Sequence, residues 1–447
     1  MTSLTFYGGV NEIGGNKILL EDQDTRIFLD FGKNYAKERE YFDFPMLQPR
    51  EEKHLLALGI LPEIEGLYKN DPQQTDVDAI LISHPHGDHY DYIRFVKDEI
   101  PIYCGEVAKS IIIAREKSGT KGPRKEYYIA NLTSKGDEEY KKFETFITGD
   151  RRTIQSIEIE PVHVDHSIPG AYGYVIHTTS GTVVYSGDLR LHGTHSKMTR
   201  DFIEKAKDAN PEILIIEGTN IPSANISSEN EVKEKCNSVV SNTRQLVLVN
   251  FAVADMDRLR TFYEVAEKND RKLVISTKQA FIVDSLQNKN NINLEDILIL
   301  QKEKQRINEW EKRIIDKYSD NIIDSMEVNK IQNEIILVLT FYDMNEMVEI
   351  RPDPGSIYIL SQSEPFNEEM EIDFNKLKNW LSYYGVPMYQ IHASGHATPQ
   401  ELKNMILEID PKKLYLIHTE RAELYKRYVS DLGIGTIIPE MDHHYDI

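Results

Sequence analysis

The chain has 447 residues, enough for two or three domains, and its 40% hydrophobic and 28% charged residues are ordinary for a globular protein. The formal net charge of −21 argues against a nucleic-acid coat or a binder of anionic membranes, but it leaves room for an enzyme with a local basic groove. No apolar run is long enough to span a membrane, and the first residues lack the pattern of a signal peptide, so we expect a cytoplasmic protein.

The chain opens with predicted strands joined by glycine-rich turns. Residues 26–30 (RIFLD) predict a strand that ends in Asp30. A carboxylate at a strand end can hold a metal-binding histidine in one tautomer, although a helix cap or a turn would use the same residue. Residues 33–75 are irregular and contain several prolines, so we expect a long excursion with short helices.

Residues 79–93 (AILISHPHGDHYDYI) hold the densest group of candidate metal ligands. The apolar run 79–82 predicts a buried strand, Gly87 permits a tight turn, and we expect a helix from Tyr90. Four ligand-type side chains follow this strand: His84, His86, Asp88 and His89. Imidazole and carboxylate suit zinc or a similar divalent ion. The chain has only two cysteines, so histidine and carboxylate must supply the whole site.

A basic stretch follows at residues 107–128. It contains Lys109, Arg115, Lys117, Lys121, Arg124 and Lys125. This stretch is the best candidate for a local patch that faces a phosphate backbone. A solvated helix and loop would show the same charges, and the sequence does not decide between the two.

Two further ligand candidates lie later in the first part of the chain. His166 precedes the turn SIPGA, and Asp188 comes directly after the strand predicted at 182–186. A carboxylate at this second position can bridge two ions. His163 alternates with apolar residues, which favours a structural role.

From about residue 209 the pattern changes to alternating strands and helices, which predicts a separate parallel-sheet domain up to residue 386. Its first predicted strand, 212–217, ends at Glu217. The tail returns to polar chemistry, and its candidates are His392, Ser394, Gly395, His396 and His418.

In this order the segments resemble the metallo-β-lactamase fold with an inserted β-CASP domain, and specifically the ribonuclease J family. LDFG, SHPHGDH, DHSIPGA and YSGD are similar to the first four motifs of the lactamase fold. Glu217 in IIEGTN, His396 in HASGHA and His418 in LIHTE are similar to the three β-CASP motifs. The resemblance covers essentially the whole chain, and the short stretch after the last motif is more similar to the archaeal members.

The resemblance implies an α/β fold class, an αββα sandwich with an inserted parallel-sheet domain. We expect the lactamase domain at 1–208, the β-CASP domain at 209–386 and the lactamase return segment at 387–447. The resemblance also implies two zinc ions, with manganese or magnesium as alternatives. One zinc would be held by His84, His86 and His166, the other by Asp88, His89 and His418, with Asp188 as the bridge. Asp30 would orient the ligands.

The family chemistry implied is metal-assisted hydrolysis of phosphodiesters. Asp88 would bind metal and could accept a proton from the attacking water. The loop of Ser394, Gly395 and His396 would bind the phosphate, through the N–H of Gly395 and the imidazole of His396. His396 could also protonate the leaving oxygen, and Glu217 would orient this machinery.

The substrate implied is single-stranded RNA with a 5′-monophosphate, degraded 5′ to 3′ in RNA decay and processing, with endonuclease activity as an addition. For the assembly we consider a homodimer, which the resemblance does not decide. Alternatives are an endoribonuclease similar to mRNA 3′-end processing factors and a DNA-directed β-CASP nuclease. His418 favours RNA, because DNA-specific relatives tend to lack a histidine at that motif. A metal-free RNA-binding scaffold and a small-molecule hydrolase are disfavoured by the intact ligands and by the inserted domain.

Overall fold

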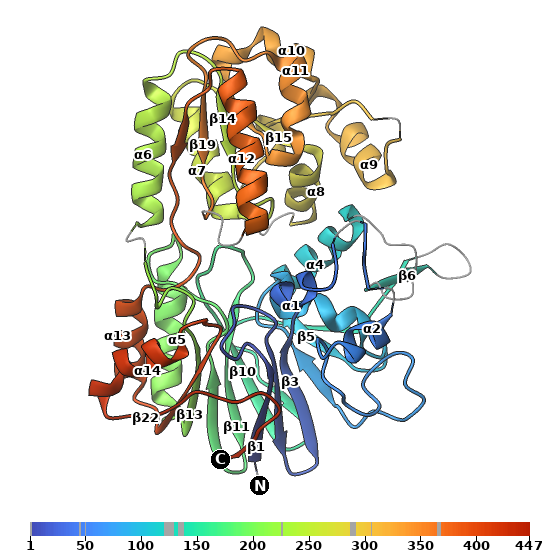
Figure 1. The fold of residues 1–447 in the computed structure, drawn as a ribbon, viewed down its shortest axis with the longest axis vertical. Helices are drawn as coiled ribbons and strands as arrows, with labels where there is room; N and C mark the ends of the chain where they lie inside the picture. The colour runs from blue at the N-terminus through green and yellow to red at the C-terminus, as the bar shows by residue number, and fades with distance from the viewer. Residues whose placement is uncertain are drawn as a thin grey trace. The chain divides into compact units, whose positions relative to one another are not determined.

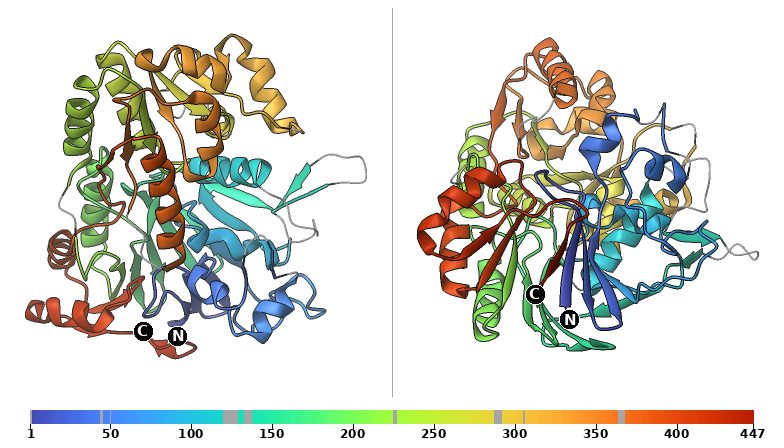
Figure 2. Two further views of the ribbon diagram at one scale, coloured as in Figure 1. Left: turned by 45° about the horizontal axis from the view of Figure 1, so that its top comes forward. Right: turned by 60° about the horizontal axis from the view of Figure 1, so that its bottom comes forward.

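A computed structural model of the chain describes residues 2–43, 46–49, 51–119, 129–132, 138–224, 227–286, 292–304, 306–363 and 368–447. The chain forms two compact units, drawn in Figures 1 and 2. The first unit consists of Met1–Leu191, His195–Ala224 and Gly395–Ile447, and the inserted unit of His192–Thr194 and Asn225–Ser394. In the described part of the chain, no helix is both long enough and apolar enough to cross a membrane.

The first unit is built on two seven-stranded sheets. The first sheet has the order β23 (His444–Asp446), β1 (Thr2–Gly8), β2 (Lys17–Asp22), β3 (Thr25–Phe31), β4 (Ala79–Leu81), β5 (Ile102–Gly105) and β8 (Phe143–Phe146). The second has the order β22 (Gly435–Ile437), β21 (Lys413–Ile417), β13 (Ile213–Glu217), β12 (Gly181–Tyr185), β11 (Tyr172–Thr178), β10 (Ile157–His163) and β9 (Arg152–Ile154). A small pair is formed by β6 (Ala130–Leu132) and β7 (Glu138–Tyr140).

The two large sheets of the first unit bury one shared apolar layer. Leu29 and Leu81 from the first sheet belong to the same buried cluster as Tyr174 and Ile215 from the second. Their opposite faces pack on separate clusters to which helices contribute. The helices of this unit are α1 (Tyr35–Arg39), α2 (Glu52–Ala57), α3 (Gly87–Tyr90), α4 (Glu106–Ser118), α5 (Ser196–Asp208), α13 (Pro399–Ile409) and α14 (Ala422–Tyr428) (Figure 1). The result is a four-layer αββα arrangement, whose inner strands are apolar on both faces because both faces are covered.

The inserted unit has one seven-stranded sheet, and all its paired strands are parallel. The order is β17 (Ile322–Ile323), β16 (Leu298–Leu300), β15 (Lys272–Ser276), β18 (Ile335–Val338), β14 (Val247–Asn250), β19 (Ile357–Leu360) and β20 (Met388–Gln390). The helices of this unit are α6 (Glu229–Ser241), α7 (Met256–Lys268), α8 (Thr277–Ser285), α9 (Glu309–Lys317), α10 (Ser325–Lys330), α11 (Met347–Ile350) and α12 (Glu368–Tyr383). Short 3₁₀ segments complete both units, among them Asp91–Phe95 and Phe341–Glu346.

The strand predicted to open the inserted domain belongs elsewhere. β13 pairs in parallel with β12 and β21, and it therefore lies in the second sheet of the first unit. β20 pairs with β19, so the inserted sheet extends past the predicted end at residue 386. The sequence placed β13 in the inserted domain because a short apolar strand has the same pattern in either parallel sheet, and it predicted no strand at the position of β20.

Candidate metal centre

The ligand loop joins β4 to a short helix. α3 begins at Gly87, before the start that the sequence predicted at Tyr90. Asp88 and His89 therefore lie in the first turn of a helix. A Cβ at position 87 would lie 2.3 Å from the hydroxyl of Tyr35, so a larger residue there would displace the Tyr35 side chain.

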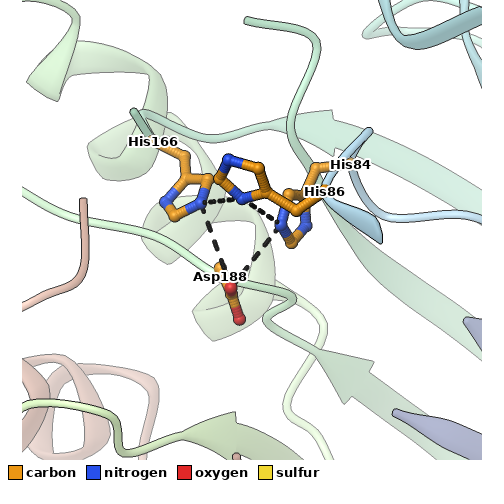
Figure 3. A group of neighbouring side chains, drawn as sticks. All are labelled: His84, His86, His166 and Asp188. Atoms are coloured by element: carbon orange, nitrogen blue, oxygen red, sulfur yellow. Dashed lines mark hydrogen bonds and ion pairs between the residues drawn. The ribbon is translucent and has the colours of Figure 1, made fainter. Parts of the chain in front are cut away.

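Four predicted ligands form a compact group: His84, His86, His166 and Asp188. Figure 3 shows their side chains converging. Nδ1 of His86 lies 3.1 Å from Nε2 of His84 and 3.1 Å from Nε2 of His166. Oδ2 of Asp188 lies 3.5 Å from Nε2 of His84 and 3.9 Å from Nε2 of His166. One atom from each residue thus faces a common point.

A second group consists of Asp88, His89 and His418, and a third of Asp188, His396 and His418. Asp188 therefore belongs to the first and third groups and also lies close to His89 of the second. Oδ2 of Asp188 lies 3.2 Å from Nε2 of His89 and 3.8 Å from Nε2 of His418. Nε2 of His418 is also 3.4 Å from Oδ2 of Asp88. The parallel pairing of β12, β13 and β21 explains this meeting, because Asp188 and His418 follow the carboxyl ends of β12 and β21, the two strands that flank β13.

Asp30 anchors the ligand loop. It follows Leu29, which pairs in parallel with Leu81, so its carboxylate reaches Ser83, two residues beyond β4. The N–H and hydroxyl of Ser83 donate to Asp30 at 2.7 and 2.8 Å. Nδ1 of His89 lies 2.7 Å from Oδ2 of Asp30, and the hydroxyl of Tyr185 donates to the same oxygen at 2.5 Å. This network leaves Nε2 as the ring atom that His89 turns toward Asp188.

Two more ligand rings are held by groups that the sequence analysis missed. Nδ1 of His418 lies 2.8 Å from the hydroxyl of Thr219, and Nδ1 of His166 lies 2.6 Å from the carbonyl oxygen of Gly395. In both rings Nε2 faces the cluster, which is the usual arrangement for metal-binding histidines. Thr219 follows Glu217 closely in sequence, but the bond to His418 spans 199 residues, so only the fold reveals it.

The electrostatics favour a cation in this cluster. Burial lowers the pKa of His84 and His166 well below the usual range of imidazole, and it lowers the pKa of His86 to about 4. These rings are therefore neutral at pH 7, the form that binds metal. Burial also acts to lower the pKa of His89, but Asp188 and other carboxylates outweigh it and raise that pKa well above its usual value.

The arrangement fits metal ions. Among the described residues, Oδ1 of Asp188 and Nε2 of His89 are buried without a hydrogen-bond partner, which is costly unless an ion or another group binds them. Nitrogen ligands about 2.0–2.1 Å from a tetrahedral zinc ion lie about 3.3–3.4 Å from one another. The separations of 3.1–3.9 Å in the first group scatter around this value. The assignment of each ligand to an ion stays a prediction.

His396 and Glu217, both predicted to be catalytic, lie together beside the cluster. Nδ1 of His396 is 3.3 Å from Oε1 of buried Glu217 and 3.8 Å from Oδ2 of Asp188. Burial acts to lower the pKa of His396, but these two carboxylates outweigh it and raise the pKa to about 9. The N–H of Thr219 donates to the other oxygen of Glu217 at 2.9 Å, which fixes the carboxylate.

The predicted phosphate loop is divided between the two units. Gly395 and His396 belong to the first unit, whereas Ser394 is the last residue of the inserted unit. There, the carbonyl oxygen of Ser394 lies 2.9 Å from Nε2 of His192. A Cβ on Gly395 would lie 2.6 Å from the hydroxyl of Ser167, so only glycine fits there.

The predicted basic patch contains at least one residue with a structural task. The guanidinium of Arg115 donates to the carbonyl oxygen of Pro85 at 2.8 Å, and it therefore supports the ligand loop. The ammonium groups of Lys109 and Lys117 lie 5.9 and 5.4 Å from the aromatic rings of Phe143 and Tyr140. The other three predicted members, Lys121, Arg124 and Lys125, lie outside the described residues.

A buried ion pair joins the segments that carry His166 and Asp188. Nε of Arg190 lies 3.2 Å from Oδ1 of Asp165, and both side chains are almost fully buried. The N–H of Arg190 also donates to the carbonyl oxygen of Asp165 at 2.8 Å. The hydroxyl of Thr199 accepts from the N–H of Asp165 and donates to the carbonyl of Arg190. These bonds fix the spacing of the two ligand segments.

Two family models and several ribonucleases J match this chain. Residues 65–226 match the β-lactamase superfamily domain, and residues 386–439 match the Zn-dependent metallo-hydrolase RNA specificity domain. The chain is 25% identical to ribonuclease J of Mycoplasma pneumoniae and 26% identical to ribonuclease J of Mycoplasma genitalium, in each case over 97% of this chain and 71% of the relative. Ribonuclease J 2 of Streptococcus pyogenes is 23% identical over 98% of the chain and 73% of the relative.

Over nearly its whole length the chain is similar to ribonucleases J. The fold agrees with a crystal structure of a protein of unknown function from Enterococcus faecalis, with a TM-score of 0.79, 22% identity and 99% of each chain covered. The predicted fold class, a metallo-β-lactamase sandwich with an inserted parallel-sheet domain, is confirmed. The similarity to short archaeal members of the ribonuclease J family stays a prediction.

Proposed function

We propose that this metal-dependent ribonuclease uses two zinc ions to hydrolyse single-stranded RNA, chiefly from a 5′-monophosphate end in the 5′-to-3′ direction. The observation that carries the two-ion centre is Oδ2 of Asp188, which lies within 3.9 Å of His84, His166, His89 and His418. The RNA substrate is supported by the names of the relatives and by the matched RNA specificity domain. The direction rests on the family resemblance.

The protein's own groups would hold substrate and protons around this centre. Zinc ions bound there would lower the pKa of a water molecule and neutralise charge on the phosphate. Asp88 is a better ligand than base, because His89 and His418 outweigh its burial and hold its pKa well below the usual range. The predicted role of Asp88 as acceptor of the water's proton is therefore disfavoured by its low basicity.

His396 would act on the phosphate or on the leaving oxygen. Glu217 holds Nδ1 of His396, so Nε2 is the ring nitrogen that would donate to substrate oxygen. The N–H of Gly395 would provide a second donor, while its carbonyl holds His166. A His396→Ala protein should keep its zinc content and lose activity by about 100-fold or more, the usual worth of a positioned proton donor. Full activity with intact zinc content would contradict this role.

The test of the proposed function compares two RNAs of one sequence, both labelled at the 3′ end. One carries a 5′-monophosphate and the other a 5′-hydroxyl, and each is incubated with the zinc-loaded protein with and without chelator. Chelator-sensitive shortening of the monophosphate RNA from its 5′ end is the expected result. Internal cuts that ignore the 5′ group would indicate an endonuclease instead, and cleavage of the matching DNA alone would indicate a DNA-directed enzyme. A homodimer and a cytoplasmic location stay predictions.

A further inference from the structure

A glycine-rich turn at residues 9–16 joins β1 to β2 beside the metal centre. Gly9, Gly14 and Gly15 have positive φ angles of 78°, 81° and 70°, a backbone that residues with a side chain rarely adopt. These glycines and Asn16 are buried. This glycine turn is therefore packed inside the first unit and does not lie free on its surface.

The backbone of the glycine turn is bonded to two ligands of the second group. The N–H of His418 donates to the carbonyl oxygen of Gly9 at 2.7 Å, and the N–H of Asn16 donates to the carbonyl oxygen of Asp88 at 3.2 Å. The turn also touches the side chain of Asp88, because a Cβ on Gly14 would lie 2.7 Å from both Cβ and Oδ2 of Asp88. Glycine at this position thus lets the turn lie directly against a metal ligand.

The side chain of Asn16 reaches the remaining ligand of that group through a chain of hydrogen bonds. Nδ2 of Asn16 donates to the hydroxyl oxygen of Tyr185 at 3.3 Å. Tyr185 gives its only hydroxyl hydrogen to Oδ2 of Asp30, and this oxygen lies 2.7 Å from Nδ1 of His89. All four side chains are almost fully buried, where each bond of such a chain strengthens the next. Asn16 therefore helps to hold His89 through two intermediate residues.

The carboxylate of Glu12 braces the glycine turn. Its Oε1 accepts from the N–H of Gly9 at 3.1 Å, and its Oε2 accepts from Nδ2 of Asn34 at 2.8 Å. Asn34 is fixed in turn, because its side chain caps α1 by accepting from the N–H of Lys37. Among the described residues, no bond joins Glu12 to a metal ligand, so Glu12 acts on His418 only through Gly9.

We propose that the glycine turn is a positioning element for one ion only, the ion of the second group, and that Asn16 and Glu12 are its positioning residues. In the described part of the chain, no hydrogen bond joins the turn to a histidine of the first group. The turn nevertheless reaches every ligand of the second group, namely Asp88, His89 and His418. The inference rests on the proposed function, since it takes a centre of two zinc ions as given.

The test measures zinc affinity in the absence of RNA, by competition between the full chain and a chelator. Asn16→Ala and Glu12→Ala should each weaken the binding of one zinc ion by about 10-fold and leave the other at wild-type affinity, as for loss of an outer partner of a metal ligand. Asn11→Gly is the matched control. Asn11 is exposed in the same turn, makes none of these bonds, and has a φ of 52° that glycine adopts without strain.

Double variants separate the two routes to the ion. Asn16 acts through Tyr185, so in a Tyr185→Phe background Asn16→Ala should weaken zinc binding further by about two-fold at most. Glu12 acts through Gly9 and His418, so Glu12→Ala should keep its effect of about 10-fold in the same background. A role in general stability alone would not produce this difference between the two residues.

The outcomes separate this inference from the proposed function. A wild-type protein that binds fewer than two zinc ions would overturn the proposed two-zinc centre itself. A wild-type protein that binds two, while Asn16→Ala and Glu12→Ala keep both affinities, would overturn the inference alone. Equal weakening of both ions, or the same loss in Asn11→Gly, would also overturn it, because the turn would then support the whole site and not one ion.

Discussion

Replacing Thr219 by valine removes the hydroxyl that holds one ring nitrogen of His418 and preserves the shape of the side chain. In the structure Oγ1 of Thr219 lies 2.8 Å from Nδ1 of His418 and donates to the carbonyl oxygen of the same residue at 3.4 Å. His418 also has an unusual left-handed backbone, with φ of 51°, so its ring depends on such contacts for its position. Losing one outer partner of a metal-binding histidine weakens metal binding by about 10- to 100-fold, or about 1.4–2.8 kcal/mol.

The loss should affect one ion and spare the other. His418 belongs to the group of Asp88 and His89, whereas the group of His84, His86 and His166 has no contact with Thr219 among the described interactions. Competition with a chelator, followed by measurement of bound zinc, gives the affinity of each zinc site. Thr219→Val should bind one of its two zinc ions more weakly than the wild type and the other with wild-type affinity. Thr219→Ser retains the hydroxyl and serves as the control. Wild-type affinity at both sites in Thr219→Val would refute the role of this bond.

Three further perturbations test the surroundings of the site. Burial lowers the pKa of Lys17 to about 7, from 10.5 in the unfolded chain. Between pH 7 and 10.5 the folded state therefore binds fewer protons than the unfolded state, and the free energy of unfolding rises with pH. Lys17→Met should remove up to about 3 kcal/mol of this rise between pH 7 and 10, and denaturant unfolding at both pH values checks it. Tyr185→Phe deletes the donor to Asp30 and should lower the free energy of unfolding by about 1.5–3 kcal/mol, measured on the metal-free protein; an unchanged value would show that the bond is not formed. Gly32→Ala would place a Cβ 1.6 Å from the carbonyl oxygen of Asp88, so zinc binding should be lost, whereas Gly435→Ala, whose Cβ would meet nothing closer than 3.5 Å, should bind zinc normally.

The sequence predicted the parts of the site that depend on local order. The ligand loop after β4 depends on residues close together in the chain. The outer partners depend on contacts between distant segments. The bond between His166 and the carbonyl of Gly395 spans 229 residues and uses a backbone atom, which no residue type reveals.

The errors have the same physical origin. β13 was placed in the inserted domain because four successive apolar residues, 213–216, fit any covered parallel strand. Arg115 was grouped with other basic residues because its charge is visible in the sequence, while its bond to the carbonyl of Pro85 is not. Resemblance to a family supplied what spacing could not, namely that His166, Asp188 and His418 would meet the ligand loop.

The most direct test of the central claim is a zinc titration of activity. The metal-free protein is mixed with 5′-monophosphate RNA, zinc is added in known amounts, and bound zinc and cleavage rate are measured on the same samples. Because the site has two neighbouring groups of ligands, we expect no cleavage without zinc and maximal cleavage at two zinc ions per chain. Full cleavage without zinc, or no cleavage with both ions bound, would contradict the account.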